Sequence, residues 1–147
     1  MPTSLYGLGG NYDLETSHVL PALLRKFREA KVSGAKEVVL WGSGSPLRQF
    51  LHCDDLADAL DFLLKHYSEF EHINVGSSTE VTIKGGAETI ARVVGCEAES
   101  VFDSSKPDGA PRKLMDSSRL HELGWNNVRS LEDGNASTYE HWFASQI

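Results

Sequence analysis

The chain has 147 residues, of which 40% are hydrophobic and 24% are charged, and its formal net charge is −7. The length suits one domain that can bury roughly 70% of its unfolded surface, and the composition is ordinary for a globular protein. The negative charge disfavours nucleic acid as a partner, because clustered Lys and Arg hold phosphate backbones. No apolar run approaches the ~18 residues of a membrane span, and the first residues lack the pattern of a signal peptide. We therefore expect neither a nucleic-acid nor a membrane partner.

The two cysteines, Cys53 and Cys96, are far apart and have no partners at metal-ligand spacing. Such thiols are typical of a reducing compartment. We expect reduced cysteines, no metal site and a cytoplasmic location.

The first third of the chain predicts one helix among short strands. Residues 1–6 are apolar and indicate a strand end that opens into a glycine-rich loop. Thr16 or Ser17 is expected to cap the helix that follows, whose apolar residues recur at helical spacing. Residues 37–41 and 47–52 predict two extended segments joined by a Gly/Ser/Pro turn.

A second helix is expected to begin at Asp54 and Asp55, because carboxylates suit the positive end of a helix. Its apolar stripe predicts a buried face, made of Leu56, Leu60, Leu63, Leu64 and Tyr67. Residues 72–75 predict a short strand.

A third helix is expected after Thr82 as its cap, although Gly85 and Gly86 in its interior each cost about 1 kcal/mol relative to Ala. A short extended piece at 101–102 precedes a loop over 106–113. Two more helices are then expected, the first capped by Ser117 and the second over 131–143, with Asn135 on its apolar face. Together these elements predict one α/β domain with short strands and about five helices.

His18 stands at a helix start, with Arg25 and Lys26 along the same helix. Nearby cations favour neutral imidazole, which suits an acid/base near neutral pH. The alternative is a surface histidine on a basic helix.

Two residues at strand positions suit a ligand that carries a base, a sugar and phosphates. Trp41 ends a strand at a glycine-rich turn, where its ring can stack on a flat ligand or pack at the core edge. Arg48 shares a strand face with Phe50 and His52. Its guanidinium needs an anionic partner, either a ligand phosphate or an acid such as Asp54 or Asp55.

The loop from Lys106 to Lys113 contains three cations, two prolines and a glycine. Because prolines lower the entropy lost on ordering, the loop suits a phosphate clamp. A solvated surface turn is the competing interpretation. Neither a dinucleotide-binding glycine fingerprint nor a nucleophile elbow is present.

These residues together resemble the GDP-L-fucose synthases, bifunctional epimerase/reductases among the extended short-chain dehydrogenases. The Arg-x-Phe-Leu-His and Asn-Val-Gly motifs occur widely in the extended dehydrogenases. The histidine helix and the Lys-Pro-Asp-Gly loop point more narrowly to the fucose synthases. The matching stretches run in order along the chain, over residues 1–7, 17–25, 39–44, 48–55, 73–76 and 105–114.

The resemblance implies an NADPH-dependent 3,5-epimerisation and 4-reduction of GDP-4-keto-6-deoxy-D-mannose to GDP-L-fucose, by a homodimer. It implies that His18 is the acid/base of epimerisation and lies close to the cofactor. The residues implied to line the nicotinamide end of NADP are Pro2, Thr3, Ser4 and Leu5. Those implied to contact the GDP-sugar substrate are Lys26, Trp41, Arg48, Asp108 and Lys113.

The chain departs from the family pattern in lacking the Tyr-x-x-x-Lys pair and the glycine fingerprint. We therefore expect residues 1–147 to form a single substrate-binding domain, the C-terminal portion of such an enzyme without its NADP-binding Rossmann domain. The isolated chain is expected to lack reductase activity unless a complementing chain supplies that half. Two alternatives are an inactive GDP-sugar-binding module and a fragment of another NAD(P)-dependent nucleotide-sugar epimerase or dehydratase.

Overall fold

The computed structural model describes residues 1–144, and within them the α/β class predicted from the sequence is confirmed, with five helices and short, mainly parallel strands. In chain order the elements are β1 (Ser4–Tyr6), α1 (Val19–Ser33), β2 (Glu37–Trp41), β3 (Leu47–His52), α2 (Cys53–His66), β4 (Glu80–Thr82), α3 (Ile83–Val94), β5 (Glu99–Asp103), β6 (Arg112–Lys113), α4 (Ser118–Glu122) and α5 (Leu131–Ala144). No helix in this range is long and apolar enough to cross a membrane.

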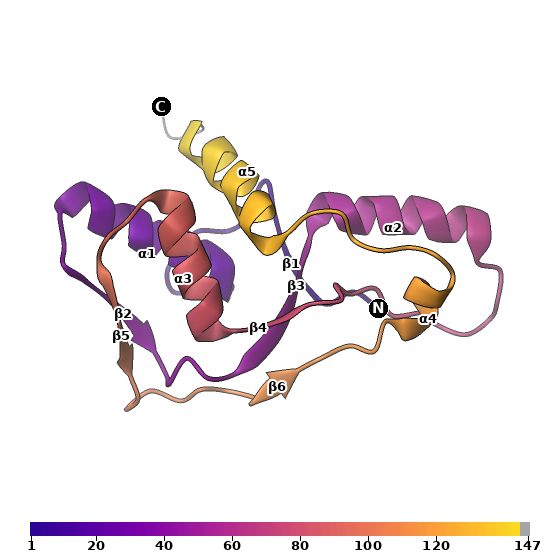
Figure 1. The fold of residues 1–147 in the computed structure, drawn as a ribbon, viewed down its shortest axis with the longest axis horizontal. Coiled ribbons are helices and arrows are strands. Elements are labelled where there is room, and N and C mark those ends of the chain that lie inside the picture. The colour runs from indigo at the N-terminus through magenta and orange to yellow at the C-terminus, as the bar shows by residue number, and fades with distance from the viewer. Residues whose placement is uncertain (145–147) are drawn as a thin grey trace.

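Strand β3 runs through the middle of the molecule and is paired along both edges (Figure 1). On one edge, β4 pairs antiparallel with Leu47 to Gln49. On the other edge, β6 pairs parallel with Leu47 and Arg48, and β1 pairs parallel with the stretch from Phe50 to His52. Strands β6 and β1 therefore lie end to end along one edge of β3, and Gln49 stands at their junction.

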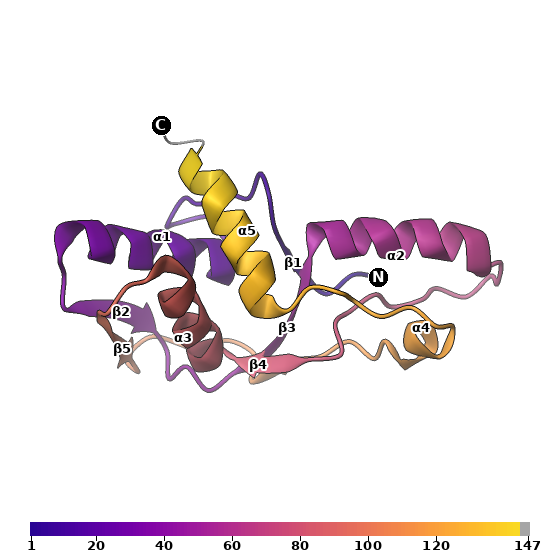
Figure 2. The same cartoon turned by 45° about the horizontal axis from the view of Figure 1, so that its top comes forward.

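The larger hydrophobic cluster fills the space among α1, α3 and α5. Leu20 and Phe27 of α1 and Ile90 of α3 are almost completely buried there, as the helical spacing of their apolar residues predicted. Strands β2 and β5 pair with each other in parallel at the same end of the molecule (Figure 2). Tyr6 of β1 and Phe50 of β3 also belong to this cluster, which therefore joins the helices to the central strands.

A smaller cluster lies at the opposite end, where Figures 1 and 2 show α2 and α4. It joins Leu51 of β3 and Ala59 of α2 with Leu120 and Trp125. The indole N–H of Trp125 donates to Asp58 on α2 at 2.8 Å, which ties the segment after α4 to that helix. Strand β3 contributes to both clusters and so connects the two ends.

Helix α2 buries only part of the apolar stripe that the sequence predicted, since Leu56 and Leu63 pack against the smaller cluster. Leu60 and Leu64 are 51% and 86% exposed, whereas Asp55 is only 3% exposed. The reason is a contact with a distant part of the chain, because Asp55 pairs with the guanidinium of Arg129 at 2.9 Å. This ion pair accounts for the burial of the Asp55 carboxylate, whereas the neighbouring Asp54 side chain stays 49% exposed.

The start of α1 also differs from the prediction. Its N-cap is His18, and the His18 side chain makes no capping hydrogen bond. The Thr16 hydroxyl instead donates to Asp13 at 2.9 Å and closes the preceding loop. The Ser17 hydroxyl is buried without a hydrogen-bond partner among residues 1–144.

Three other segments correct the strand and cap predictions. Residues 72–75 form no regular strand and contribute only an isolated bridge between Val75 and Pro2. Strand β6 appears inside the expected 106–113 loop. Ser117 is the N-cap of α4, as predicted, but its side chain makes no capping hydrogen bond.

A buried polar group lies between β3 and α5. His52 is 2% exposed, and its Nδ1 accepts the N–H of Asp54, which makes His52 the cap of α2 and starts the helix at Cys53. Its Nε2 lies 3.5 Å from the Thr138 hydroxyl, and its ring meets Tyr6 edge-on at 5.3 Å between centroids. His52, Cys53 and Asp54 bring atoms that could bind a metal ion within 4.8 Å of one another. Both ring nitrogens of His52 are already engaged within the fold, however. Burial lowers the pKa of His52, and the Asp54 carboxylate opposes this shift in part.

Because the folded pKa of His52 is depressed, we predict that His52 makes the fold less stable in acid. The unfolded chain takes up this proton near pH ~6.5 while the folded chain resists it, so stability falls as the pH drops through that value. Thermal unfolding between about pH 7.5 and about pH 5.5 should show a smaller loss of Tm in His52→Gln than in the parent chain. The exposed His72 provides the control, since His72→Gln should leave the slope unchanged. An unchanged slope in His52→Gln would contradict this assignment.

Glycines in the helix interiors have opposite surroundings. Gly86 faces α1, where a Cβ would meet Cδ2 of Leu20 at an ordinary 3.9 Å. At Gly134 in α5, a Cβ would collide with the hydroxyl of Tyr6 and lie 3.0 Å from its Cζ. The adjoining Asn135 is fully buried, and its Nδ2 donates to the Leu131 carbonyl at 2.7 Å, while its Oδ1 has no partner within residues 1–144.

We predict opposite effects of alanine at these two glycines. Gly86→Ala should raise the free energy of unfolding by about 0.5–1 kcal/mol, because alanine favours the helix and the space admits a methyl group. Gly134→Ala should lower it by about 1–3 kcal/mol, because the Tyr6 ring must move. Urea denaturation of both variants measures the two changes, and two changes of the same sign would refute the packing argument.

Candidate functional site

A pocket of about 760 Å³ opens where β1, the start of α1, β3 and β6 meet. These segments are far apart in the sequence, and each contributes residues that the sequence marked as candidates. The candidates that line this pocket are Pro2, Thr3, Ser4, Leu5, His18, Arg48 and Lys113.

The pairing along β3 explains why a hollow forms here. Strand β6 ends with Lys113 opposite Arg48, and β1 already occupies the same edge from Ser4 opposite Phe50. The chain after Lys113 therefore leaves the edge of β3, and Leu114 and Met115 pass over the gap as one wall of the pocket. Gaps between diverging chain segments at a sheet are common binding crevices.

Arg48 and Lys113 place two positive charges side by side on neighbouring strands. The Arg48 guanidinium donates to the carbonyl of Leu47 at 2.7 Å and forms no ion pair with an acid among residues 1–144. The suggestion that Asp54 or Asp55 neutralises Arg48 is wrong, because Arg129 pairs with both acids. Like charges on facing strand positions repel, so this pair favours an anionic ligand.

The other cations of the 106–113 loop are used within the fold. Arg112 makes two hydrogen bonds with the Glu80 carboxylate, at 2.8 and 2.6 Å, and lowers the pKa of that carboxyl group. The ammonium of Lys106 lies over the Trp41 ring, 5.6 Å from its centroid. Lys113 is thus the cation of this loop that faces the pocket.

Asp108 closes the loop against the turn after β2. Its carboxylate accepts from the Ser43 N–H at 2.6 Å and from the Ser43 hydroxyl at 2.8 Å. Gly42, with φ of 84°, leaves the space that the carboxylate occupies. The structure therefore gives Asp108 an intramolecular role, and contact with a ligand stays a prediction.

Trp41 and Lys26 lie outside the pocket lining, in a second group beside β2. Trp41 is 69% exposed, and the Lys26 ammonium donates to the Val39 carbonyl at 3.0 Å. The 106–113 loop approaches Arg48, because a Cβ at Gly109 would lie 3.9 Å from the Arg48 Nη2. Arg48 thus lies between the pocket and the loop that carries Asp108.

His18 is exposed at the mouth of the pocket, where the extended backbone before α1 presents its imidazole. The expected cationic neighbours face elsewhere. Arg25 donates to Glu29 at 2.7 Å and to the Tyr12 carbonyl at 3.1 Å, and Lys26 reaches β2. The cations expected beside His18 are thus engaged in other contacts of the fold.

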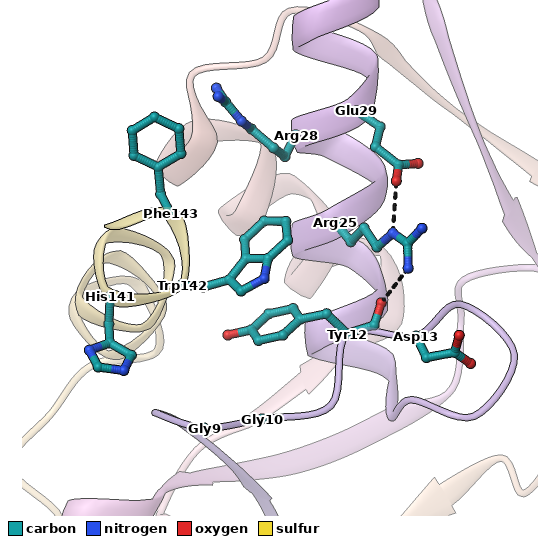
Figure 3. A pocket seen from close by; sticks show the side chains of 10 residues that line it. All are labelled: Gly9, Gly10, Tyr12, Asp13, Arg25, Arg28, Glu29, His141, Trp142 and Phe143. Atoms are coloured by element: carbon teal, nitrogen blue, oxygen red, sulfur yellow. Dashed lines mark hydrogen bonds and ion pairs between the residues drawn. The ribbon is translucent and has the colours of Figure 1, made fainter. Parts of the chain in front are cut away.

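A second hollow, of about 950 Å³, lies between the 9–13 loop, α1 and α5 (Figure 3). Its rings pack on one another, since Tyr12 stacks on Trp142 at 4.5 Å between centroids. The Arg28 guanidinium covers the Phe143 ring at 4.5 Å. None of the predicted site residues lines this hollow, so we place the candidate site in the first pocket.

Sequence reasoning missed the apolar part of the site. Phe50, Leu114 and Met115 line the pocket beside the predicted cations. The period-2 spacing that joins Phe50 to Arg48 was a usable signal, and Leu114 follows directly from Lys113. Gln49 points away from the strand face of Arg48, and nothing in the sequence around it indicated a role in the site.

Comparisons with known proteins agree with this geometry. The NAD dependent epimerase/dehydratase family model matches residues 1–76, which include β1, His18 and Arg48. The chain is 60% identical over 147 residues to "Putative GDP-L-fucose synthase 2" of Arabidopsis thaliana, covering 100% of this chain and 44% of the relative. It is 51% identical to the GDP-L-fucose synthase of Escherichia coli K12, covering 97% of this chain and 47% of the relative.

A solved GDP-L-fucose synthetase from Naegleria fowleri with NADP bound has a TM-score of 0.91 at 32% identity. The alignment covers 99% of this chain and 46% of that one, so the chain spans less than half the length of these relatives. Because the family model covers more than half of the 147 residues, the chain belongs to the NAD dependent epimerase/dehydratase family.

Proposed function

We propose that this chain is the substrate-side part of a GDP-L-fucose synthase, the NADPH-dependent enzyme that converts GDP-4-keto-6-deoxy-D-mannose to GDP-L-fucose. The observation that carries the proposal is the pocket on β3, where β1, His18, Arg48 and Lys113 converge. The identity of 60% to a curated relative supports the same assignment. Residues 1–147 then act as one substrate-binding domain, and a Rossmann domain with the Tyr-x-x-x-Lys pair is supplied by sequence beyond these residues or by a complementing chain. We assign the assembled enzyme to the cytoplasm, as a homodimer.

Arg48 and Lys113 hold the diphosphate of the GDP-sugar in this proposal. Their positive charges face the pocket from neighbouring strands, and no acid among residues 1–144 is paired with either side chain. A guanidinium suits two phosphate oxygens at once, and an ammonium adds a point charge. Trp41, Lys26 and Asp108 contact another part of the nucleotide-sugar, which extends past Arg48 toward β2 and the 106–113 loop.

The wall formed by Pro2, Thr3, Ser4 and Leu5 is assigned to the nicotinamide end of NADP. Pro2, Ser4 and Leu5 are exposed, Phe50 lies beside them as the strand partner of Ser4, and Met115 also lines the pocket. Apolar groups such as Leu5 and Phe50 suit one face of a planar ring, and the hydroxyls of Thr3 and Ser4 can orient it. The bound cofactor supplies the hydride for the reduction step.

His18 is assigned the acid/base role in epimerisation. Epimerisation beside a ketone requires removal and return of a carbon-bound proton, and an imidazole commonly performs such transfers. His18 lines the pocket between β1 and the cations, and its side chain makes no hydrogen bond within the described range. Its ring is therefore available to a substrate held by Arg48 and Lys113.

The phosphate assignment predicts that Arg48→Ala weakens binding of GDP-mannose to the chain by about 10- to 100-fold. The reason is that a charge-assisted contact contributes about 1.5–3 kcal/mol. Calorimetric titration measures the affinity, with UDP- and dTDP-sugars testing the base. Arg92→Ala is the matched control, because Arg92 of α3 pairs with Glu132 of α5 at 3.1 Å and does not line the pocket. Equal affinities of the parent and Arg48→Ala would make Arg48 structural.

The histidine assignment predicts that His18→Gln suppresses deuterium uptake into the sugar ring by about 10²- to 10⁴-fold. The experiment uses a chimera in which this chain replaces the matched part of the Escherichia coli relative, with turnover in heavy water. Mass spectrometry of the product then reports exchange separately from hydride transfer. A chimera without activity on the keto-sugar would refute the proposed function, and undiminished exchange in His18→Gln would leave this histidine as a surface residue.

A further inference from the structure

We infer that Gln49 is a positioning residue that fixes the Lys113–Met115 wall of the pocket relative to β1. The inference rests on the proposed function only for the identity of the ligand. Gln49 does not line the pocket, and it acts through the segment that carries Lys113.

The contacts of Gln49 converge from three parts of the chain. Its Nε2 donates to the Ser77 carbonyl at 2.9 Å, and its Oε1 accepts the N–H of Met115 at 3.1 Å. Its backbone carbonyl accepts from the Thr3 hydroxyl at 3.3 Å. Gln49 thus joins the segment of Thr3, the loop of Ser77 and the segment of Met115.

The position of Gln49 explains why a side chain is needed here. Backbone pairing of β6 with β3 ends at Lys113, because β1 takes the edge from Phe50 onward. The N–H of Met115 consequently has no strand partner, and the Gln49 amide takes the place of the missing ladder bond. Without that amide, the bonds from this segment to β3 within residues 1–144 are those of the short β6 ladder.

The environment of Gln49 leaves its amide little freedom. The residue is 4% exposed, and a Cβ at Gly76 would lie 3.2 Å from Oε1 and 2.7 Å from the Ser117 hydroxyl oxygen. Glycine at this position therefore lets the amide and Ser117 approach the backbone. A buried amide that has both its donor and its acceptor engaged fixes its neighbours in one arrangement.

The functional consequence concerns Lys113. It pairs with Arg48 through β6, only two residues before the bond between Met115 and Gln49. If that bond is lost, Lys113 keeps its charge and its ladder pairing with Arg48, but the chain after it is less firmly fixed and its side chain is held less precisely. Gln49 therefore affects the affinity for a diphosphate through Lys113 and contributes no contact of its own.

The test compares the 147-residue chain with Gln49→Met, which keeps the volume and removes both hydrogen bonds. Asn135→Leu is the matched control, because it also removes a buried amide, in α5 and outside the pocket lining. Titration with GDP-mannose should show about tenfold weaker binding for Gln49→Met. The affinity of the Asn135→Leu control should equal that of the parent chain. In a Lys113→Ala background, Gln49→Met should add little further loss, because both changes act on one interaction.

Hydrogen exchange provides a readout that needs no ligand. The amides of residues 113–115 should exchange faster in Gln49→Met than in Asn135→Leu at equal global stability. Equal exchange in the two variants, unchanged affinity in Gln49→Met, or losses that add fully with Lys113→Ala would each overturn the inference. If the parent chain binds no GDP-sugar, the proposed function fails, and the exchange comparison still decides whether Gln49 positions this wall.

Discussion

The rest of the site depends on how β3 shares one of its edges between two strands. Strand β6 covers Leu47 and Arg48, and β1 covers Phe50 to His52, so neither can extend past Gln49. This constraint ends β6, turns the following chain outward and opens the pocket at the junction. It also places a cation-bearing strand and the exposed β1 wall on either side of that opening.

Charge is distributed unevenly around this junction. Some surface cations have acids beside them, as in the pairs of Arg112 with Glu80 and Arg119 with Glu71. Arg48 and Lys113 face each other without such a partner among residues 1–144, although the chain as a whole is acidic. Two adjacent cations lower the stability of the empty fold by mutual repulsion, and a bound diphosphate removes that repulsion. The arrangement therefore favours ligand binding over stability of the free chain.

Sequence patterns predicted the structural features that depend on residues close together in the chain. The apolar spacing of α1, the Thr82 cap and the last helix were all predictable, because each depends on residues within a few turns. The burial of Asp55 on α2 was not, since its ion pair with Arg129 joins residues 74 positions apart. Of the pocket-lining candidates, those from Pro2 to Leu5 came from the family resemblance alone. Spacing and composition singled out His18, Arg48 and the 106–113 loop but left each between two interpretations. The role of Gln49 needed the register of β3 with β1 and β6, which no single segment encodes.

The junction at Gln49 also determines when the pocket can appear during folding. Its bonds join Thr3 and Met115, at sequence separations of 46 and 66 residues. Contacts of such separation form after local helices, because loop closure costs entropy before the contact stabilises anything. A chain emerging from the ribosome can therefore complete its first helices early, but it cannot assemble the pocket until the segment around Met115 has been synthesised. Recognition of an anion is a property of the finished fold and cannot guide its early steps.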